Sequence, residues 1–198
     1  MGFILLTRGH TSIPGVAAPD VQFVGNASCP TDGNSAYGAA APSTNASPAV
    51  GQTVAEMPHN HVDPPTKITY LHDPPTSGCH YNLGAGKAPL SPGLYDTPVS
   101  PEYWVHNLEH GYVVVLYNCP AGCAGDVATL RAWYGGLAND PLLSTEKKVL
   151  VLPETTMATR FAVVSWDWYL ALDRLDLSRV QAFYLNHRDQ SPESNQAP

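Results

Sequence analysis

The chain has 198 residues, of which 43% are hydrophobic and only 14% are charged, and its formal net charge is -7. This length and hydrophobic content suit one domain of ordinary size with a packed core. The ten Lys and Arg residues form no basic run, which argues against nucleic acid and anionic membranes as partners. No stretch approaches the ~20 apolar residues of a membrane-spanning helix, so we expect no transmembrane segment in this chain.

Residues 1–55 are rich in Ala, Ser, Pro, Gly, Asn and Thr and show no sustained periodicity. This composition predicts an irregular arm or linker, within which residues 21–24 are a candidate edge strand. We expect residues 56–190 to form a single globular domain and residues 191–198 to form a polar tail. The apolar run at residues 3–6 is shorter than the roughly 7 to 15 residues of a secretory signal, so the presence of such a signal stays open.

Residues 56–104 contain one turn signal after another, including Asp63-Pro64-Pro65 and Asp73-Pro74-Pro75. The pattern predicts long, structured loops that are rich in Pro and Gly, with one short strand over residues 67–71. Loops of this length inside a domain are usually functional.

Regular elements are predicted from residue 105 onwards. Strands are expected at 112–118, 148–152 and 161–168, because these runs are apolar and rich in β-branched or aromatic residues. Helices are expected at 126–137, with Asp126 as the N-cap, and at 177–186.

The order strand, helix, strand, strand, helix predicts an α+β or α/β domain with a small mixed sheet and helices packed on it. The first two strands should be parallel and joined by a crossover helix, and the short link to the third suggests an antiparallel neighbour. This order resembles the C-terminal half of a thioredoxin-like domain.

Four cysteines are present, at positions 29, 79, 119 and 123. An even number in a charge-poor chain fits two disulfides and a secreted or cell-envelope location. Of the three possible connectivities, one closes the short loop from Cys119 to Cys123 and leaves Cys29 to pair with Cys79. The three residues between Cys119 and Cys123 do not match the Cys-x-x-Cys redox spacing.

Histidines are the main candidates for chemistry, since the chain has eight of them and five lie between residues 59 and 106. His106 and His110 have the i, i+4 spacing that places two imidazoles on one face of a helical turn, where they can chelate an ion. Glu109 lies between them as a candidate general base or as an acceptor for an imidazole N–H. The alternative is that both histidines only cap a strand.

Further candidate ligands lie elsewhere in the chain. His80 follows a Pro-rich turn that should hold it rigidly, and His61 shares one side of an extended segment with His59. Met157 could add a thioether, and imidazole with thioether favours copper, whereas imidazole alone suits zinc equally well. Met157 could instead fill the core.

Two motifs, PPTSGxH ending at His80 and VHxLEHG over residues 105–111, resemble domain-of-unknown-function family 3105 across about residues 56–190. The resemblance implies an envelope or secreted location and a shared site at His61, His80, His106 and His110. The family pattern usually has Pro where this chain has Cys79, and this departure suggests a local disulfide.

Three functional hypotheses follow. The first is an extracytoplasmic copper-binding protein, an oxidoreductase or a metal store or carrier, with five candidate ligands: His61, His80, His106, His110 and Met157. The second is a zinc-dependent hydrolase in which Glu109 acts as base toward a metal-bound water. The third is a non-enzymatic surface or assembly subunit, a homo-oligomer that forms through the arm at residues 1–55. Whether the chain is an enzyme stays open.

Overall fold

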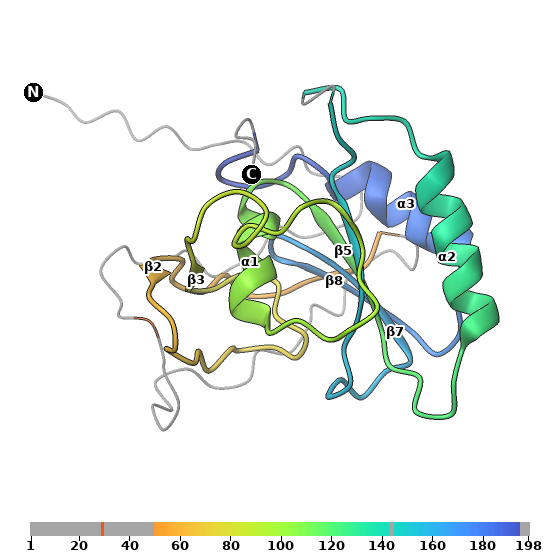
Figure 1. Cartoon of the computed structure of the whole chain (residues 1–198), viewed down its shortest axis with the longest axis horizontal. Helices are drawn as coiled ribbons and strands as arrows, with labels where there is room; N and C mark the ends of the chain where they lie inside the picture. Colours follow the sequence, from red (N-terminus) through yellow and green to blue (C-terminus); the bar gives the residue numbers. More distant parts are fainter. Residues whose placement is uncertain (1–28, 30–49, 143–144, 195–198) are drawn as a thin grey trace, which may run out of the picture.

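A mixed β-sheet with helices on both faces forms the centre of the fold (Figure 1). The computed structural model describes residue 29 and residues 50–142 and 145–194. Within these residues it contains three helices, one six-stranded sheet and one two-stranded sheet. The predicted α+β fold with a mixed sheet is therefore confirmed.

The six-stranded sheet has the strand order β1-β8-β7-β5-β6-β4. Strands β4, β5 and β6 are parallel, whereas β7, β8 and β1 each run antiparallel to the preceding strand in the sheet. The strands are β1 (Gln52–Thr53), β4 (Gly93–Leu94), β5 (Val113–Tyr117), β6 (Val149–Pro153), β7 (Phe161–Ser165) and β8 (Trp168–Leu172). The predicted parallel crossover and the antiparallel third strand are both present, while the likeness to a thioredoxin-like domain stays a prediction.

Alternate residues of the central strands face different helices, because successive side chains point to opposite sides of a sheet. Along β5, Val114 and Leu116 pack in the cluster that contains α1 (Pro101–Glu109). Val113 and Val115 pack in the other cluster, with residues from α2 (Ala124–Gly136) and α3 (Leu177–His187). The result is three layers, with α1 on one face and α2 and α3 on the other.

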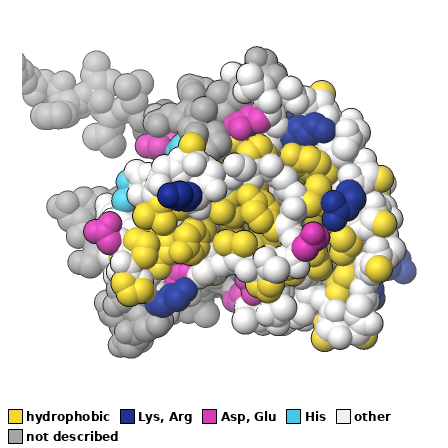
Figure 2. Space-filling model, viewed as in Figure 1, with side chains coloured by type: hydrophobic (Ala, Val, Ile, Leu, Met, Phe, Trp, Pro, Cys, Tyr) yellow, Lys and Arg dark blue, Asp and Glu magenta, His cyan; other side chains and the backbone are white. Residues whose placement is uncertain are grey.

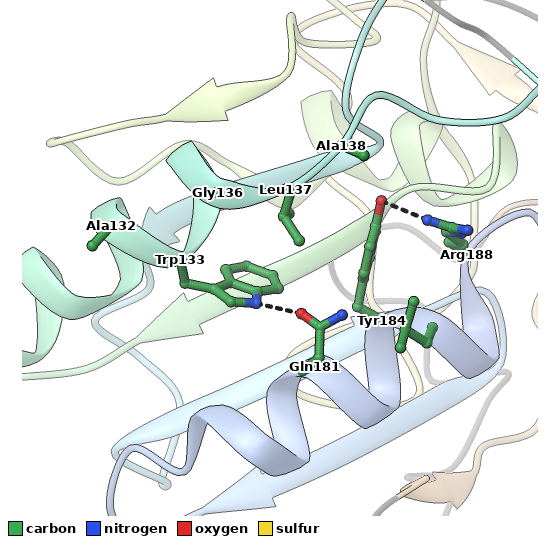
Figure 3. A pocket seen from close by; sticks show the side chains of 9 residues that line it. Ala132, Trp133, Gly136, Leu137, Ala138, Gln181, Tyr184 and Arg188 are labelled. Atoms are coloured by element: carbon green, nitrogen blue, oxygen red, sulfur yellow. Dashed lines mark hydrogen bonds between the residues drawn. The ribbon is translucent and has the colours of Figure 1, made fainter.

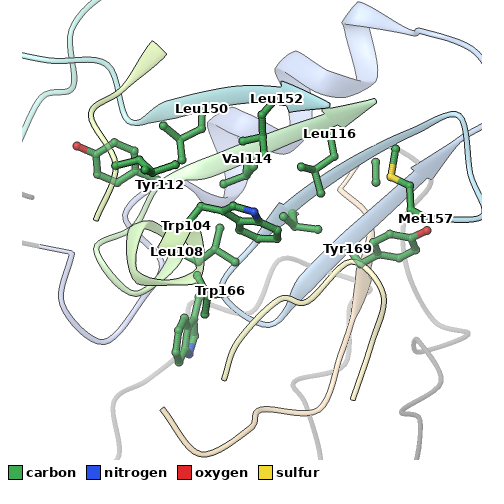
Figure 4. Close-up of a cluster of buried hydrophobic side chains, with 14 of the residues drawn as sticks. Trp104, Leu108, Tyr112, Val114, Leu116, Leu150, Leu152, Met157, Trp166 and Tyr169 are labelled. Atoms are coloured by element: carbon green, nitrogen blue, oxygen red, sulfur yellow. The ribbon is translucent and has the colours of Figure 1, made fainter. Parts of the chain in front are cut away.

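The α1 side of the sheet is closed by large apolar side chains (Figure 4). Trp104 and Leu108 of α1 are fully buried against the sheet. Burying a side chain of this size contributes about 1.5 to 3 kcal/mol relative to leaving it exposed. This face therefore fixes α1, and with it the residues that α1 carries, against a rigid support.

The other face is covered less completely, because Leu130 is the one buried residue of α2. A groove runs between α2 and α3, where Trp133 Nε1 donates to Gln181 Oε1 at 2.7 Å and Arg188 donates to the Tyr184 hydroxyl at 3.2 Å (Figure 3). Charged side chains are scattered singly over the face that Figure 2 shows, as the low charged fraction leads one to expect.

Several predicted elements differ from the structure. Residues 67–71 form no strand, since only Ile68 makes a single β-bridge, and its amide donates to the Glu102 carboxylate at 3.1 Å. The run at 161–168 is a hairpin of β7 and β8, which turns at Trp166 and at Asp167, whose φ is 63°. The N-cap of α2 is Cys123 rather than Asp126. Helix α1 was predicted only as one helical turn around His106 and His110, although Pro at its first position is a known start signal.

The cysteines pair as Cys29–Cys79 and Cys119–Cys123, so the expected two disulfides are present, with the connectivity that closes the short loop from Cys119 to Cys123. In the described part of the chain, no helix is long and apolar enough to cross a membrane. The candidate strand at 21–24 lies outside the described residues, as does most of the predicted arm. The division at residues 55 and 190 stays a prediction.

Replacing Leu130 by Ala tests how α2 is attached. We expect Leu130→Ala to lower the free energy of unfolding by about 2 to 5 kcal/mol, because it leaves a cavity under the only fully buried residue of the helix. Leu185→Ala on α3, where Leu185 is 56% exposed, is the matched control and should change stability by less than about 0.5 kcal/mol. Urea unfolding measures both, and equal effects would contradict this account of α2.

Candidate metal centre

The two-stranded sheet brings two predicted site residues together. Strand β2 (His61–Val62) pairs in parallel with β3 (His80–Tyr81), and the register sets His61 directly beside His80. The two ring centroids are 5.0 Å apart. His61 and His80 are 19 positions apart in the sequence, and only the pairing of β2 with β3 brings them side by side.

The turn before His80 is rigid. Gly78 has φ 136°, and a Cβ at this position would lie 2.7 Å from the Tyr70 ring, so only glycine fits here. The Ser77 hydroxyl accepts a hydrogen bond from the Met57 amide at 3.0 Å, and Cys79 is tied by its disulfide. These contacts leave the fully buried His80 ring little freedom.

Helix α1 supplies the other side of the site, beside β3 (Figure 1). His106 and Glu109 are three positions apart and therefore share a face of the helix. Between them, Asn107 exchanges two hydrogen bonds of 2.8 Å with the backbone of Leu90. Gly111 then turns the chain into β5 with φ 84°, where a Cβ would lie 2.9 Å from the backbone of Asp189.

Four donor atoms converge at this point, one each from His61, His80, His106 and Glu109, and all lie within 4.8 Å of one another. Bonds of about 2.1 Å to one ion keep ligand atoms within about 4.2 Å of each other. Binding would therefore draw a pair at the upper limit of this range together by at least about 0.6 Å, and by about 1.4 Å in tetrahedral coordination. His61, whose side chain is 46% exposed, has the freedom to make this movement.

Backbone carbonyls orient two of the rings. His80 Nδ1 donates to the Gly78 carbonyl at 2.9 Å, and His106 Nδ1 donates to the Tyr81 carbonyl at 2.8 Å. Since a carbonyl can only accept, Nδ1 carries the hydrogen, and the neutral ring presents the lone pair of Nε2. Hydrogen bonds of this kind typically orient metal-binding histidines.

The buried Nε2 of His80 lies 3.0 Å from Glu109 Oε2, and it has no hydrogen-bond partner among the described residues. Because His80 Nδ1 donates its hydrogen to the Gly78 carbonyl, a ring with no second hydrogen would set two lone pairs against each other in this buried contact. A cation between or on these atoms removes the conflict, either as a proton on His80 or as a metal ion. The residues therefore fit a bound cation.

The pKa values of three of the four donor residues are shifted toward the protonation states that bind a metal ion. Burial raises the pKa of Glu109, but the hydrogen bond with His59 and the neighbouring His80 outweigh it and bring the pKa to about 2. Burial, assisted by the neighbouring His80, lowers the pKa of His106 to about 3 and also lowers that of His61. At neutral pH Glu109 is therefore anionic and these two rings are neutral, as metal ligation requires.

Two predicted ligands lie apart from the four-donor group. His110 is the C-cap of α1, with its ring 4.7 Å from that of His106 and its Nε2 3.5 Å from Glu193 Oε2. Met157 is 2% exposed and packs in the apolar cluster around Trp104 (Figure 4). The structure thus brings together His61, His80, His106 and Glu109, while ligand roles for His110 and Met157 remain predictions.

Sequence reasoning missed His59 as a partner of Glu109. His59 Nδ1 lies 2.7 Å from Glu109 Oε1, and its ring packs edge-on against Trp166. The hydrogen bond to Glu109 raises the pKa of His59 despite partial burial. Its position two residues before His61 was the available signal, but only the folded chain shows that it reaches the carboxylate.

Residues near the C-terminus form hydrogen bonds with the backbone at the end of α1, where Glu109 lies. The Ser191 hydroxyl donates to the Glu109 carbonyl at 2.6 Å, and the Glu193 amide donates to the same carbonyl at 3.0 Å. The Asp189 amide donates to the Gly111 carbonyl at 2.9 Å. This segment, residues 189–194, therefore fixes the end of α1.

The low pKa of His106 predicts a loss of stability in acid. The unfolded chain takes up this proton near pH 6.5 and the folded chain only near pH 3, so stability falls as the pH decreases between these values. The variant His106→Asn can keep the bond to the Tyr81 carbonyl but has no imidazole to protonate. From pH 7 to pH 5 its free energy of unfolding should therefore fall less than that of the original protein, by on the order of 1 to 2 kcal/mol. Urea unfolding at both pH values measures this, and identical losses would contradict it.

Comparisons with known proteins point to a family and to no individual relative. No curated protein and no solved structure matches the chain. One family model, described as Protein of unknown function (DUF3105), matches residues 61–198, which include all four donors of the site. The suspected resemblance is thereby confirmed, and the chain belongs to the DUF3105 family.

Proposed function

We propose that this chain binds one divalent transition-metal ion, with copper bound most tightly, through His61, His80, His106 and Glu109. The observation that carries the proposal is the buried contact of 3.0 Å between His80 Nε2 and Glu109 Oε2, two atoms that only a cation reconciles. A proton alone would satisfy one pair, whereas an ion would also engage the nitrogens of His61 and His106.

The donor set decides the class of metal. Three imidazoles and one carboxylate suit copper, zinc, iron or nickel, whereas magnesium and calcium take oxygen ligands. Because Met157 lies in the apolar core, its thioether adds no argument for copper. Copper is preferred here because a given nitrogen and oxygen site binds Cu²⁺ more tightly than Zn²⁺, and zinc is the alternative ion.

Storage or delivery of the ion fits the site better than hydrolysis does. The most exposed donor, on His61, opens the site to solvent and gives an ion a route in and out. A general base works best with a pKa near the working pH, and a Glu109 carboxylate with a pKa of about 2 is a weak base. We place this role in an oxidising, extracytoplasmic compartment, which the two disulfides support.

Metal analysis of protein purified without an affinity tag tests the proposal. The protein should bind about one equivalent of Cu²⁺, with a visible absorption band and a paramagnetic resonance signal typical of nitrogen and oxygen ligands. His80→Ala and His106→Ala should each weaken binding at least 100-fold, because each removes an oriented, buried donor. Isothermal titration with Cu²⁺ and Zn²⁺ measures the affinities.

Two matched controls accompany this titration. His72→Ala removes a histidine that bonds within its own loop, to the Pro74 carbonyl, and Met157→Leu conserves volume in the core. Both should leave affinity within about threefold of the original protein. Undiminished binding by the His80→Ala and His106→Ala double variant would refute the assigned ligands. Weaker Cu²⁺ binding by Met157→Leu, with an intact fold, would restore the thioether as a ligand.

His59 is expected to strengthen metal binding without contacting the ion. Its bond to Glu109 Oε1 holds the carboxylate so that Oε2 faces the other donors. His59→Ala should lower metal affinity about 10- to 100-fold, as loss of such supporting contacts generally does. His59→Asn, which can place an amide N–H near the position of Nδ1, should recover most of the affinity. Equal losses in both variants would show that the ring acts in another way.

A further inference from the structure

The two disulfides differ in how deeply they are buried and in the length of chain that each one closes. Cys79 is fully buried, and its bond with Cys29 spans 50 positions of the chain. Cys119 and Cys123 are only four positions apart, each is half-buried, and the three residues between them are exposed. Since cross-linking stabilises a fold less when the closed loop is shorter, opening the Cys119–Cys123 bond should cost the fold little.

The position of Cys123 favours its thiolate. Cys123 is the N-cap of α2, and no side chain caps this helix end. The first amides of the helix therefore point toward the Cys123 side with no capping oxygen, and a helix N-terminus lowers the pKa of a cysteine thiol. Asp126 in the first turn would oppose a negative charge, but it is paired with Arg160 at 3.0 Å.

A surface groove lies beside the other cysteine, Cys119. The groove has a volume of about 330 Å³ and includes Cys119, the tip of the loop and Arg160. The Gly122 amide donates to the Cys119 carbonyl at 2.8 Å, and Gly122 has φ 86°, so the loop is a defined turn. A thiol on an extended peptide can approach Cys119 here, while Cys123 remains at the helix end.

We propose that Cys119 and Cys123 form a reversible redox pair that oxidises two cysteine thiols on a peptide or protein partner. A partner thiolate attacks the sulfur of Cys119, the Cys119–Cys123 bond breaks, and Cys123 leaves as a thiolate at the start of α2. The second partner thiolate then attacks the mixed disulfide and releases Cys119. The partner gains one disulfide and loses two electrons and two protons, and the two cysteines become thiols.

This pair lacks the two-residue spacing of Cys-x-x-Cys. The assignment depends on the exposed loop between the two cysteines, on the uncapped helix end and on the groove. It is independent of the metal proposal, because neither cysteine belongs to the four-donor group.

Equilibration in redox buffer tests the pair. The full-length oxidised protein is incubated under native conditions with mixtures of reduced and oxidised dithiothreitol, quenched in acid and alkylated, and each cysteine is quantified by peptide mass spectrometry. The Cys119–Cys123 bond should be at least 100-fold easier to reduce than Cys29–Cys79, a difference of about 59 mV for two electrons. Circular dichroism should stay unchanged, and reoxidation should restore the bond.

Transfer to a partner is tested with a reduced peptide that carries two cysteines, mixed with one equivalent of oxidised protein. Peptide disulfide and protein dithiol should appear in equal amounts. The double variant Cys119→Ser with Cys123→Ser is the control, and it should leave the peptide reduced while it retains Cys29–Cys79 and metal affinity. Reduction of both disulfides only on unfolding, or a peptide that the original protein leaves reduced, would overturn the proposal.

Discussion

The site depends on one constraint, which is that His80 Nε2 and Glu109 Oε2 are held 3.0 Å apart in a buried contact. The β2–β3 register, the glycine turn before His80 and the packing of α1 each contribute to this proximity. Such a pair is costly to bury without a compensating cation, and breaking a buried pair by removing one partner is also strongly destabilising. The surrounding fold thus holds these two groups in a geometry that a bound cation would make favourable.

The sequence predicted the C-terminal elements well, because β5, β6 and α3 carry clear apolar patterns with recognisable ends. The sequence-based prediction was wrong where two strands follow each other with only a two-residue turn between them. The hairpin of β7 and β8 reads as one strand, because Trp166 and Asp167 turn the chain without a glycine. Helix α1 was hidden in a Pro-rich region, although Pro101 marks its start.

The site shows the same limit of sequence reasoning. The i, i+4 spacing singled out His106 and His110, whereas the folded chain gathers His106 with Glu109, because the helix ends there and His110 lies at the cap. The approach of His61, and of His59 to Glu109, depends on contacts between segments distant in sequence. No local pattern encodes such contacts, so the family motifs were the better guide to His80 and His106.

Residues 189–194 hold the end of α1 largely through carbonyl groups of the helix end. Two of their three hydrogen bonds come from backbone amides, and all three end on the carbonyls of Glu109 or Gly111. Two side chains of the segment make ion pairs as well, Glu193 with His110 at the C-cap of α1 and Asp189 with the buried Lys148. Main-chain and side-chain contacts thus combine here, and removal of the segment would free the helix end from which Glu109 projects.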